Sequence, residues 1–266
     1  MPEGDTIHAV ARALKPELVG RRLTLLEAHQ RPVPWGPGAL VTACEAVGKH
    51  LFVHFETALG QRFVRVHLGM KGSWHRYRPA EAWQRNPNSR RLVLATSDWL
   101  FVCFGPKEVE VGLRPKASHL GPDLLAAEPH IYYMSEIVAR ARRVELDLGD
   151  LLLTQTVACG IGNVYKSETL FLERLDPWRA TASVSDVQLV AIYQRAQALM
   201  RENLERGGWR MTTPRSGAAG DRVHGGQRYW VYRRANRPCR RCGRPVSSRL
   251  QGLMARMTYW CPGCQT

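Results

Sequence analysis

The sequence has no long apolar run and is short of acidic residues. Its 266 residues hold 23 Asp and Glu against 38 Lys and Arg, so the formal net charge is +15 and the pI is near 10. A membrane-spanning helix needs about 20 consecutive apolar residues, and none is present. Residues 2–16 are amphipathic and carry acids, unlike a secretory signal. We therefore expect a soluble, cytoplasmic protein without membrane partners or structural disulfides.

Lysine is also scarce, because most of the 38 basic residues are arginine. The planar guanidinium group of arginine matches phosphate oxygens in a bidentate way. A strongly basic protein of this kind indicates an anionic partner, and nucleic acid is the first candidate. Charge alone leaves two alternatives open, which are a biased genome composition and an anionic membrane surface.

Four of the seven cysteines form two matched pairs near the end of the sequence: Cys239, Cys242, Cys261 and Cys264. Each pair has the spacing C-x2-C, and eighteen residues separate the pairs, which is typical of a zinc ribbon. A disulfide pair or a redox C-x-x-C motif is less favoured. The remaining cysteines, Cys44, Cys103 and Cys159, lie in apolar stretches and are expected to be buried.

The sequence begins with Met1, Pro2 and Glu3. Removal of Met1 would leave a secondary amine at Pro2 beside a carboxylate. An α-amino group titrates about two units below a lysine side chain, so part of it is unprotonated at neutral pH. Such an amine can attack an electrophilic carbon and form a Schiff base. The alternative is an ordinary Met-Pro start without chemical meaning.

Periodicity divides the chain into a strand-rich half and a helical half. Apolar residues at helical spacing predict a helix that starts just behind Pro2, with Asp5 or Thr6 as its N-cap and Gly20 as its stop. From 22 to 113 the period changes to two, which predicts an antiparallel sandwich. The clearest strands are 51–55, 64–68, 92–96 and 99–104.

A stretch with proline and glycine at 121–129 is interpreted as a linker. Helices are then predicted at 135–144, 149–157, 163–175 and 186–205. Between two of them lies Cys159-Gly160-Ile161-Gly162-Asn163, where a helix N-terminus could hold phosphate. A tight helical hairpin is the simpler interpretation of these glycines taken alone. Residues 207–226 are glycine-rich and basic and are predicted to form a mobile loop.

Four segments together resemble the Fpg/Nei DNA glycosylases: MPEGDTI at 1–7, HLGMKGSW at 67–74, VACGIGNVYKSE at 157–168 and RMTYWCPGCQ at 256–265. The first and last of them are more similar to the endonuclease VIII (Nei) branch. The resemblance implies an α+β multidomain fold. Its parts would be an N-terminal β-sandwich flanked by helices (1–120), a linker (121–134), a helix–two-turn–helix domain (135–228) and a C-terminal zinc finger (229–266).

The resemblance also implies a monomeric, bifunctional DNA glycosylase and abasic-site lyase with one structural zinc ion and damaged DNA as its partner. Pro2 would attack C1′ of the damaged nucleotide, and Glu3 would transfer protons to the sugar. Lys49 would contact phosphate and assist elimination. Asn163 would hold a backbone phosphate, and Arg256 would clamp the phosphate beside the flipped nucleotide and assist the second elimination.

A flipped nucleotide leaves a hole in the duplex that a side chain has to fill. Met70, between glycines in the 67–74 segment, is the first candidate, and a buried core methionine is the alternative. Phe104 is a second candidate, although it could simply end a buried strand. The arginine that the purine-specific Fpg branch places two residues earlier is Val102 here.

The expected substrates are therefore oxidised bases, with pyrimidines favoured over 8-oxoguanine. Two alternatives remain, which are an Fpg-like 8-oxoguanine and formamidopyrimidine glycosylase and a non-catalytic zinc protein that binds damaged DNA. The sequence departs from the family in two places. A few residues after Pro-Glu, where the family often carries its second acid, this chain has Asp5-Thr6, and its finger loop is two residues longer. The arginine-rich composition fits a GC-rich bacterial source, with action at the nucleoid.

Overall fold

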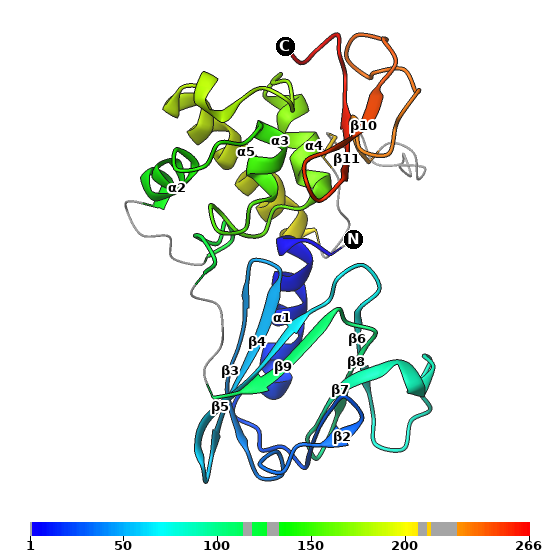
Figure 1. Ribbon diagram of the computed structural model, residues 1–266. Helices are drawn as coiled ribbons and strands as arrows, with labels where there is room; N and C mark the ends of the chain where they lie inside the picture. Colours follow the sequence, from blue (N-terminus) through cyan, green and yellow to red (C-terminus); the bar gives the residue numbers. More distant parts are fainter. Residues whose placement is uncertain (1, 114–118, 127–132, 207–211, 214–227) are drawn as a thin grey trace. The chain divides into compact units, whose positions relative to one another are not determined.

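The computed structural model describes residues 2–113, 119–126, 133–206, 212–213 and 228–266. The chain divides into two compact units, Met1–His119 and Leu120–Thr266 (Figure 1). Most of the predicted loop at 207–226 and the end of the predicted linker at 121–129 lie outside the described residues. In the described part of the chain, no helix has the length and apolar character needed to cross a membrane.

The first unit opens with helix α1, Gly4–Leu18, as the pattern predicts. The cap is Glu3, two residues before Asp5, the nearer of the two expected caps, because the Glu3 carbonyl oxygen accepts the N–H groups of Thr6 (3.0 Å) and Ile7 (3.2 Å). An acceptor in this position satisfies amide groups that have no partner inside the helix. The buried face of the helix consists of apolar residues at helical spacing, from Ile7 to Leu18.

Two antiparallel sheets follow, and they confirm the predicted sandwich (Figure 1). The five-stranded sheet has the order β2 (Arg31–Pro32), β1 (Leu25–Ala28), β7 (Arg90–Ala95), β8 (Leu100–Phe104) and β6 (Ser73–Tyr77). The four-stranded sheet has the order β3 (Leu40–Val47), β4 (His50–Thr57), β5 (Gly60–His67) and β9 (Glu108–Gly112). A short 3-10 helix, Pro87–Ser89, precedes β7.

One apolar core joins α1 to both sheets. Alternate residues of β4, such as Leu51 and Val53, point into it, and Leu92 and Leu94 of β7 do the same from the other sheet. All four are at most 1% exposed. Each such side chain contributes about 1.5–3 kcal/mol when it is fully buried. The first unit is thus held mainly by apolar burial, and this core fixes the position of the N-terminal helix.

The second unit contains the helices and the cysteine-bearing segment. Its elements are α2 (Tyr133–Ala141), α3 (Leu148–Leu153), α4 (Asn163–Leu172), a 3-10 turn (Thr181–Ser183), α5 (Asp186–Glu205), β10 (Ser247–Gln251) and β11 (Arg256–Trp260). Helix α5 has the predicted bounds because Ser185 and Gln188 form a reciprocal capping box. Helix α4 stops three residues before the predicted end, since Arg174 takes a left-handed conformation at φ 60°.

Helix α4 is buried on all sides from Asn163 to Phe171, so its polar side chains need partners. The Glu168 carboxylate accepts the backbone N–H groups of Trp230 (2.7 Å), Val231 (2.9 Å) and Tyr232 (2.7 Å). Burial raises the pKa of Glu168, and these hydrogen bonds oppose that shift. One carboxylate therefore ties the start of the segment 229–266 to the middle of the helical unit.

Candidate functional site

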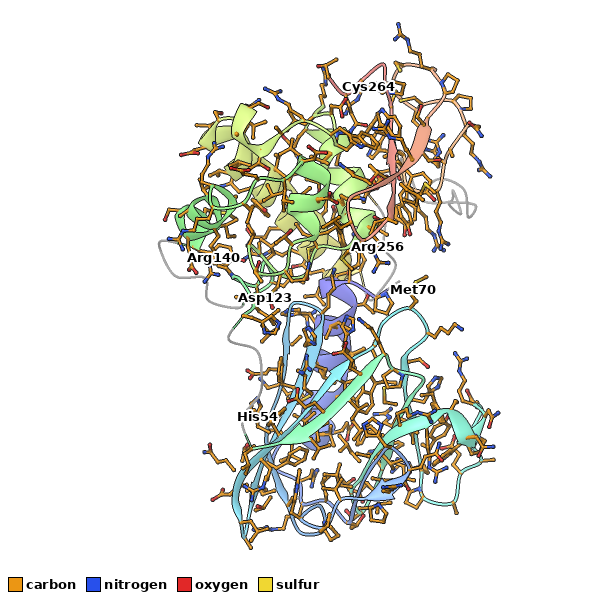
Figure 2. All side chains as sticks on the ribbon, viewed as in Figure 1. His54, Met70, Asp123, Arg140, Arg256 and Cys264 are labelled. Carbon is orange, nitrogen blue, oxygen red and sulfur yellow. The ribbon has the colours of Figure 1, made fainter. Side chains whose placement is uncertain are left out.

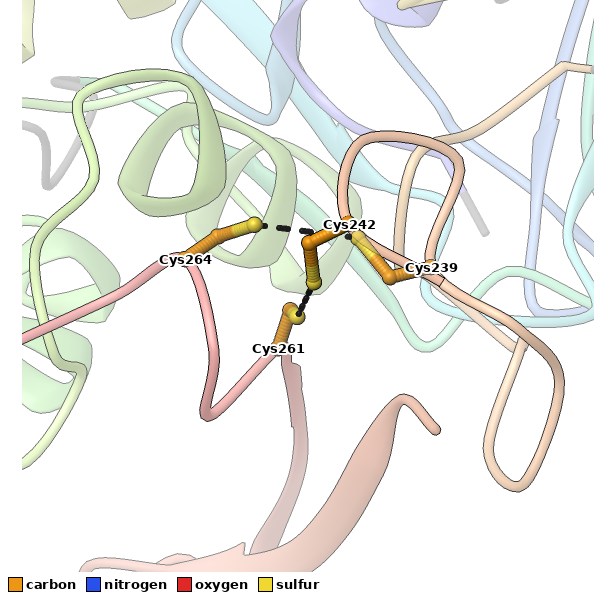
Figure 3. Close-up of side chains that lie close together, drawn as sticks. All are labelled: Cys239, Cys242, Cys261 and Cys264. Carbon is orange, nitrogen blue, oxygen red and sulfur yellow. Dashed lines mark hydrogen bonds between the residues drawn. The ribbon is translucent and has the colours of Figure 1, made fainter. Parts of the chain in front are cut away.

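The four paired cysteines gather in one cluster, with their sulfur atoms all within 4.8 Å of one another (Figure 3). The Sγ atoms of Cys242 and Cys261 are 3.4 Å apart, and those of Cys239 and Cys264 are 3.9 Å apart. Four thiolates at about 2.3 Å around a tetrahedral zinc ion would lie about 3.8 Å from one another. The donor set and its spacing therefore fit zinc. Among the described residues, no other group of three or more metal-ligating side chains gathers in this way.

A backbone N–H group of Arg244 stabilises the thiolate of Cys242, whose pKa is lowered to about 7. A depressed pKa favours the deprotonated sulfur that binds a metal ion. The hairpin of β10 and β11 leads directly into the second cysteine pair, so metal binding would fix the hairpin as well.

Arg256 begins strand β11 and is exposed, paired across the hairpin with Gln251. Arg256 and Cys264 lie at opposite ends of the finger (Figure 2). The carbonyl oxygen of the next residue, Met257, accepts the side-chain N–H of Asn163 at 2.6 Å. Two residues that the resemblance assigns to phosphate binding, Asn163 and Arg256, are therefore brought together although they are 93 positions apart in the sequence.

Asn163 is the first residue of α4, follows the capping residue Gly162 and is 8% exposed. Its Nδ2 faces a carbonyl oxygen, so the orientation of the amide is fixed, and Oδ1 has no hydrogen-bond partner among the described residues. The turn before it needs glycine, since Gly160 has φ 111° and its N–H is held by Gln155 at 3.1 Å. The turn is thus a tight connection that ends at the buried first residue of α4.

In the first unit, Pro2 is half-buried and Glu3 is fully buried at the start of α1. Asp5, in the first helical turn, is 5% exposed. Carboxylates are favoured at this end of a helix because the free amide groups give it a positive potential. The residue predicted to be the nucleophile is therefore followed at once by an acid in a fixed position.

Lys49 lies at the tip of the β3–β4 hairpin, in a two-residue loop that Gly48 begins at φ 56°. A loop of this length with a positive φ at its first residue matches the right-handed twist of the strands. Lys49 is half-buried. The sequence reasoning expected it near the first strands, and the structure places it at the end of the sheet that carries His50 and His67.

Sequence reasoning missed the histidine pair beside Lys49. His50 and His67 are cross-strand partners with ring centres 4.9 Å apart. Burial lowers the pKa of His50 to about 4, helped by His67 and by Arg65, whose guanidinium is 3.2 Å from its Nδ1. Burial also lowers the pKa of His67. The pairing could have been found by aligning the two predicted strands in antiparallel register.

The two candidates for filling the duplex differ in exposure. Met70 is 68% exposed on a turn in which Gly72 is required, because a Cβ there would lie 2.4 Å from the carbonyl oxygen of Leu68 (Figure 2). Phe104 is 3% exposed and packs edge-on against His75 and Trp83, with ring centres 5.4 and 5.6 Å away. Met70 can reach a ligand without rearrangement, whereas Phe104 ends a buried strand.

A β-sandwich unit, a helical unit and a four-cysteine cluster that could hold a metal ion are the parts that the resemblance to the DNA glycosylases implies. Residues 1–105 match the formamidopyrimidine-DNA glycosylase N-terminal domain, and residues 120–215 match the formamidopyrimidine-DNA glycosylase H2TH domain. The helix–two-turn–helix domain and the sandwich are therefore both confirmed.

Two relatives and a solved structure match this chain over nearly its full length. The probable endonuclease 8 2 of Streptomyces coelicolor is 35% identical over 280 residues, which cover 100% of this chain and 94% of that protein. The DNA-(apurinic or apyrimidinic site) lyase Nei2 of Mycolicibacterium smegmatis is 34% identical and is covered to 99% by the whole chain. The crystal structure of MutM (Fpg) from Thermus thermophilus matches with a TM-score of 0.76 at 26% identity, over 99% of this chain and 98% of that one.

The chain therefore belongs to the formamidopyrimidine-DNA glycosylase family, with relatives named endonuclease 8, and is an enzyme of the DNA glycosylase and abasic-site lyase class.

Proposed function

We propose that this enzyme excises oxidised bases from DNA, pyrimidines in preference to 8-oxoguanine, and then cleaves the strand by β,δ-elimination. The observation that carries the proposal is the pairing of Pro2 with the fully buried Glu3 at the start of α1. The helix is anchored in the apolar core of the sandwich, and this packing holds the start of α1, with Pro2 and Glu3, in position.

In the first step, the Pro2 amine of the trimmed chain attacks C1′ of the damaged nucleotide. The bond from C1′ to the base breaks, and the base leaves with the bonding electrons and takes up a proton. The bond from C1′ to the ring oxygen then breaks, the oxygen becomes a hydroxyl group, and the proline nitrogen, having lost its one proton, is left as a cationic imine (iminium) with C1′. Glu3 supplies and takes up the proton at the sugar oxygen, which requires a carboxyl group within hydrogen-bond reach of that oxygen. A cap residue adjacent to the nucleophile supports that role.

In the second step, the imine makes the hydrogen on C2′ acidic, and loss of this proton expels the 3′ phosphate. A further elimination expels the 5′ phosphate. Lys49 on its hairpin tip contacts phosphate near the lesion and assists this chemistry. Asn163 and Arg256 hold the phosphate on the other side, and the hydrogen bond from Asn163 to Met257 supports their joint action.

The preference for pyrimidines is supported by Val102 at the position where the purine-specific branch carries arginine. Val102 is fully buried in the cluster under Phe104, so it presents no polar group to a base.

Cys239, Cys242, Cys261 and Cys264 would hold one structural zinc ion, which supplies rigidity to the finger and takes no part in the reaction. A ribbon that carries Arg256 needs this support, since its own apolar cluster is small.

The test is borohydride trapping of untagged protein on a duplex with an abasic site, beside the Pro2→Gly and Glu3→Gln variants. A covalent adduct that needs the free amine of residue 2 supports imine chemistry. Retained zinc and DNA affinity without any adduct would favour a protein that only binds damaged DNA.

The substrate preference needs its own experiment. Matched duplexes with thymine glycol or 8-oxoguanine, each opposite cytosine and adenine, should show faster release of thymine glycol. Faster release of 8-oxoguanine from cytosine pairs would contradict the pyrimidine assignment and favour an Fpg-like purine enzyme.

A further inference from the structure

The finger segment 229–266 combines a strong charge bias with an apolar tip. It has eight arginines and no aspartate or glutamate. Four large apolar side chains at the end of its hairpin are nevertheless exposed: Leu250 (56%), Leu253 (108%), Met254 (68%) and Met257 (36%). We call these four side chains the apolar tip. A soluble protein rarely leaves such a group together on one short hairpin unless a partner covers it.

The hairpin geometry gathers the apolar tip in one place. Leu250 and Met257 are direct cross-strand partners, so their side chains share one face of the hairpin. Leu253 and Met254 lie in the turn between the strands, which Gly252 (φ 68°) and Ala255 (φ 45°) bend back. The N–H of Ala255 donates to the carbonyl oxygen of Gly252 at 3.0 Å and closes the turn.

The opposite face of the hairpin is firmly anchored. The buried Lys166 of α4 donates from Nζ to Thr258 Oγ1 at 2.7 Å, and Thr258 donates in turn to Gln251 Oε1 at 2.7 Å. Gln251 then donates from Nε2 to the carbonyl oxygen of Pro177 at 2.8 Å. A Cβ at Gly252 would lie 2.2 Å from the Asp150 carboxylate, so the turn seats directly on α3.

A rigid base with an exposed apolar end is what a wedge requires, because little conformational entropy is lost when it binds. The charge of its own segment favours an anionic partner: Arg249 and Arg256 stand before and after the tip in the sequence, and the segment 229–266 has no acidic side chain. The Asp150 carboxylate of α3 lies against Gly252, and the Arg249 guanidinium lies over the Trp178 ring at 4.2 Å, so Arg256 is the arginine assigned to phosphate here. Proteins that bend DNA insert apolar side chains between base steps from the minor groove while arginines hold the phosphates.

We propose that Leu253 and Met254 form an apolar wedge that enters the minor groove of duplex DNA and partly unstacks a base step. The inference rests on the proposed function only in taking DNA as the substrate. It adds a part to the reaction: the wedge lowers the cost of extracting the damaged nucleotide before any covalent step.

The test uses the full-length zinc-loaded protein and a duplex with an uncleavable tetrahydrofuran abasic analogue. The Leu253→Ser/Met254→Ser double variant is compared with Leu59→Ser, which alters an equally exposed leucine (69%) on the sandwich. We expect the double variant to bind roughly tenfold more weakly, with an unchanged slope of log affinity against log salt, because apolar contacts release no counterions. Arg256→Gln should instead reduce that slope by about one.

A 2-aminopurine placed next to the analogue reports unstacking directly. The wild-type protein should raise its fluorescence, and the double variant should raise it much less at saturating protein. Affinity and fluorescence equal to those of Leu59→Ser would overturn the wedge. The same holds if the double variant instead loses binding to anionic vesicles or loses self-association, since the tip would then serve another partner.

Zinc content and thermal unfolding of the variants should match the wild type, because the changed side chains are exposed. Borohydride trapping separates this inference from the proposed chemistry. A missing adduct with tip-dependent unstacking would refute the lyase mechanism and leave the wedge standing, whereas a normal adduct without tip-dependent unstacking would do the reverse.

Discussion

The sandwich and the finger each carry groups assigned to the same reaction, but they are built from different interactions. The sandwich surrounds α1 with a large apolar core that joins both sheets. The finger has a small apolar cluster, centred on Val231, Val246 and two of the cysteines. Its remaining support comes from the cysteine cluster and from buried polar contacts with α4. Groups in the sandwich are thus positioned by apolar packing, and the hairpin that begins with Arg256 is positioned by the cysteine cluster and by polar contacts.

Metal removal should affect the two regions most differently. Zinc binding contributes about 10–16 kcal/mol in isolated finger peptides, so chelation should unfold the segment 229–266 and leave the sandwich folded. We expect loss of the second elimination and of DNA affinity, together with retained hydrogen-exchange protection in β4 and β5. Removal of zinc with cleavage intact would show that the finger does not position Arg256.

Core truncation in the sandwich should give the next largest effect. Leu51→Ala removes a side chain that is 1% exposed and should cost about 2–5 kcal/mol. Denaturant unfolding of the full chain measures this loss, and hydrogen exchange assigns it to the first unit. Protection in α5 should stay unchanged, which controls for general destabilisation.

The matching change in the second unit is Lys166→Met. It keeps an unbranched apolar side chain that is one atom shorter but leaves the buried Thr258 hydroxyl without its donor, which should cost about 1–3 kcal/mol. Unlike Leu51→Ala, it should also loosen the hairpin that carries Arg256, so the ratio of δ- to β-elimination product falls at saturating substrate. An unchanged product ratio would mean that Lys166 stabilises the unit without positioning the hairpin.

The two regions should also respond oppositely to acid. His50 has a folded pKa of about 4, below its unfolded value of 6.5, so the unfolded sandwich binds a proton that the folded one refuses. Stability of the sandwich is therefore complete above about pH 6.5 and falls as the pH drops toward 4. His67, whose pKa is also lowered, acts in the same direction.

Glu168 has the opposite sign, because burial raises its pKa above the unfolded value of 4.5. The folded helical unit then gains a proton first, so this group adds stability as the pH falls and loses it as the pH rises through the folded pKa. Hydrogen exchange at several pH values between about 4 and 7 should show the sandwich weakening in acid before the helical unit. His50→Phe should flatten the response of the sandwich, and an unchanged response would exclude His50 as its cause.

Local patterns predicted the elements that local chemistry decides. The apolar spacing of α1, the capping residues of α5 and the alternation in β4 and β5 were enough to place them. The cysteine spacing likewise predicted the cluster. The early end of α4 could not be predicted, because it depends on the left-handed backbone conformation of Arg174, which arginine seldom adopts.

Long-range contacts account for the rest. No sequence pattern singled out Lys166, and its partner Thr258 is 92 residues away. The burial of Phe104 depends on the loop residue Trp83, whose ring packs edge-on against it, and the strand pattern does not reveal that contact. The apolar tip is exposed because the finger is too small to bury it, which the hydrophobic pattern of a short hairpin does not reveal. The domain boundaries and the roles of the site residues stay predictions.

The smallest expected effect on stability concerns Met70, and the buried Phe104 is its counterpart in the same unit. Because its side chain is 68% exposed, Met70→Ala should change the free energy of unfolding by less than about 0.5 kcal/mol. Phe104→Ala should cost about 3–5 kcal/mol, since it empties a buried position.

If Met70 fills the space left by the flipped nucleotide, Met70→Ala slows base excision and leaves strand cleavage at a preformed abasic site nearly unchanged. Equal slowing of both reactions would give Met70 a role in DNA binding alone. No change in either reaction would mean that Met70 does not fill the duplex. The apolar tip of the finger would then have to fill it without help from an exposed side chain of the sandwich.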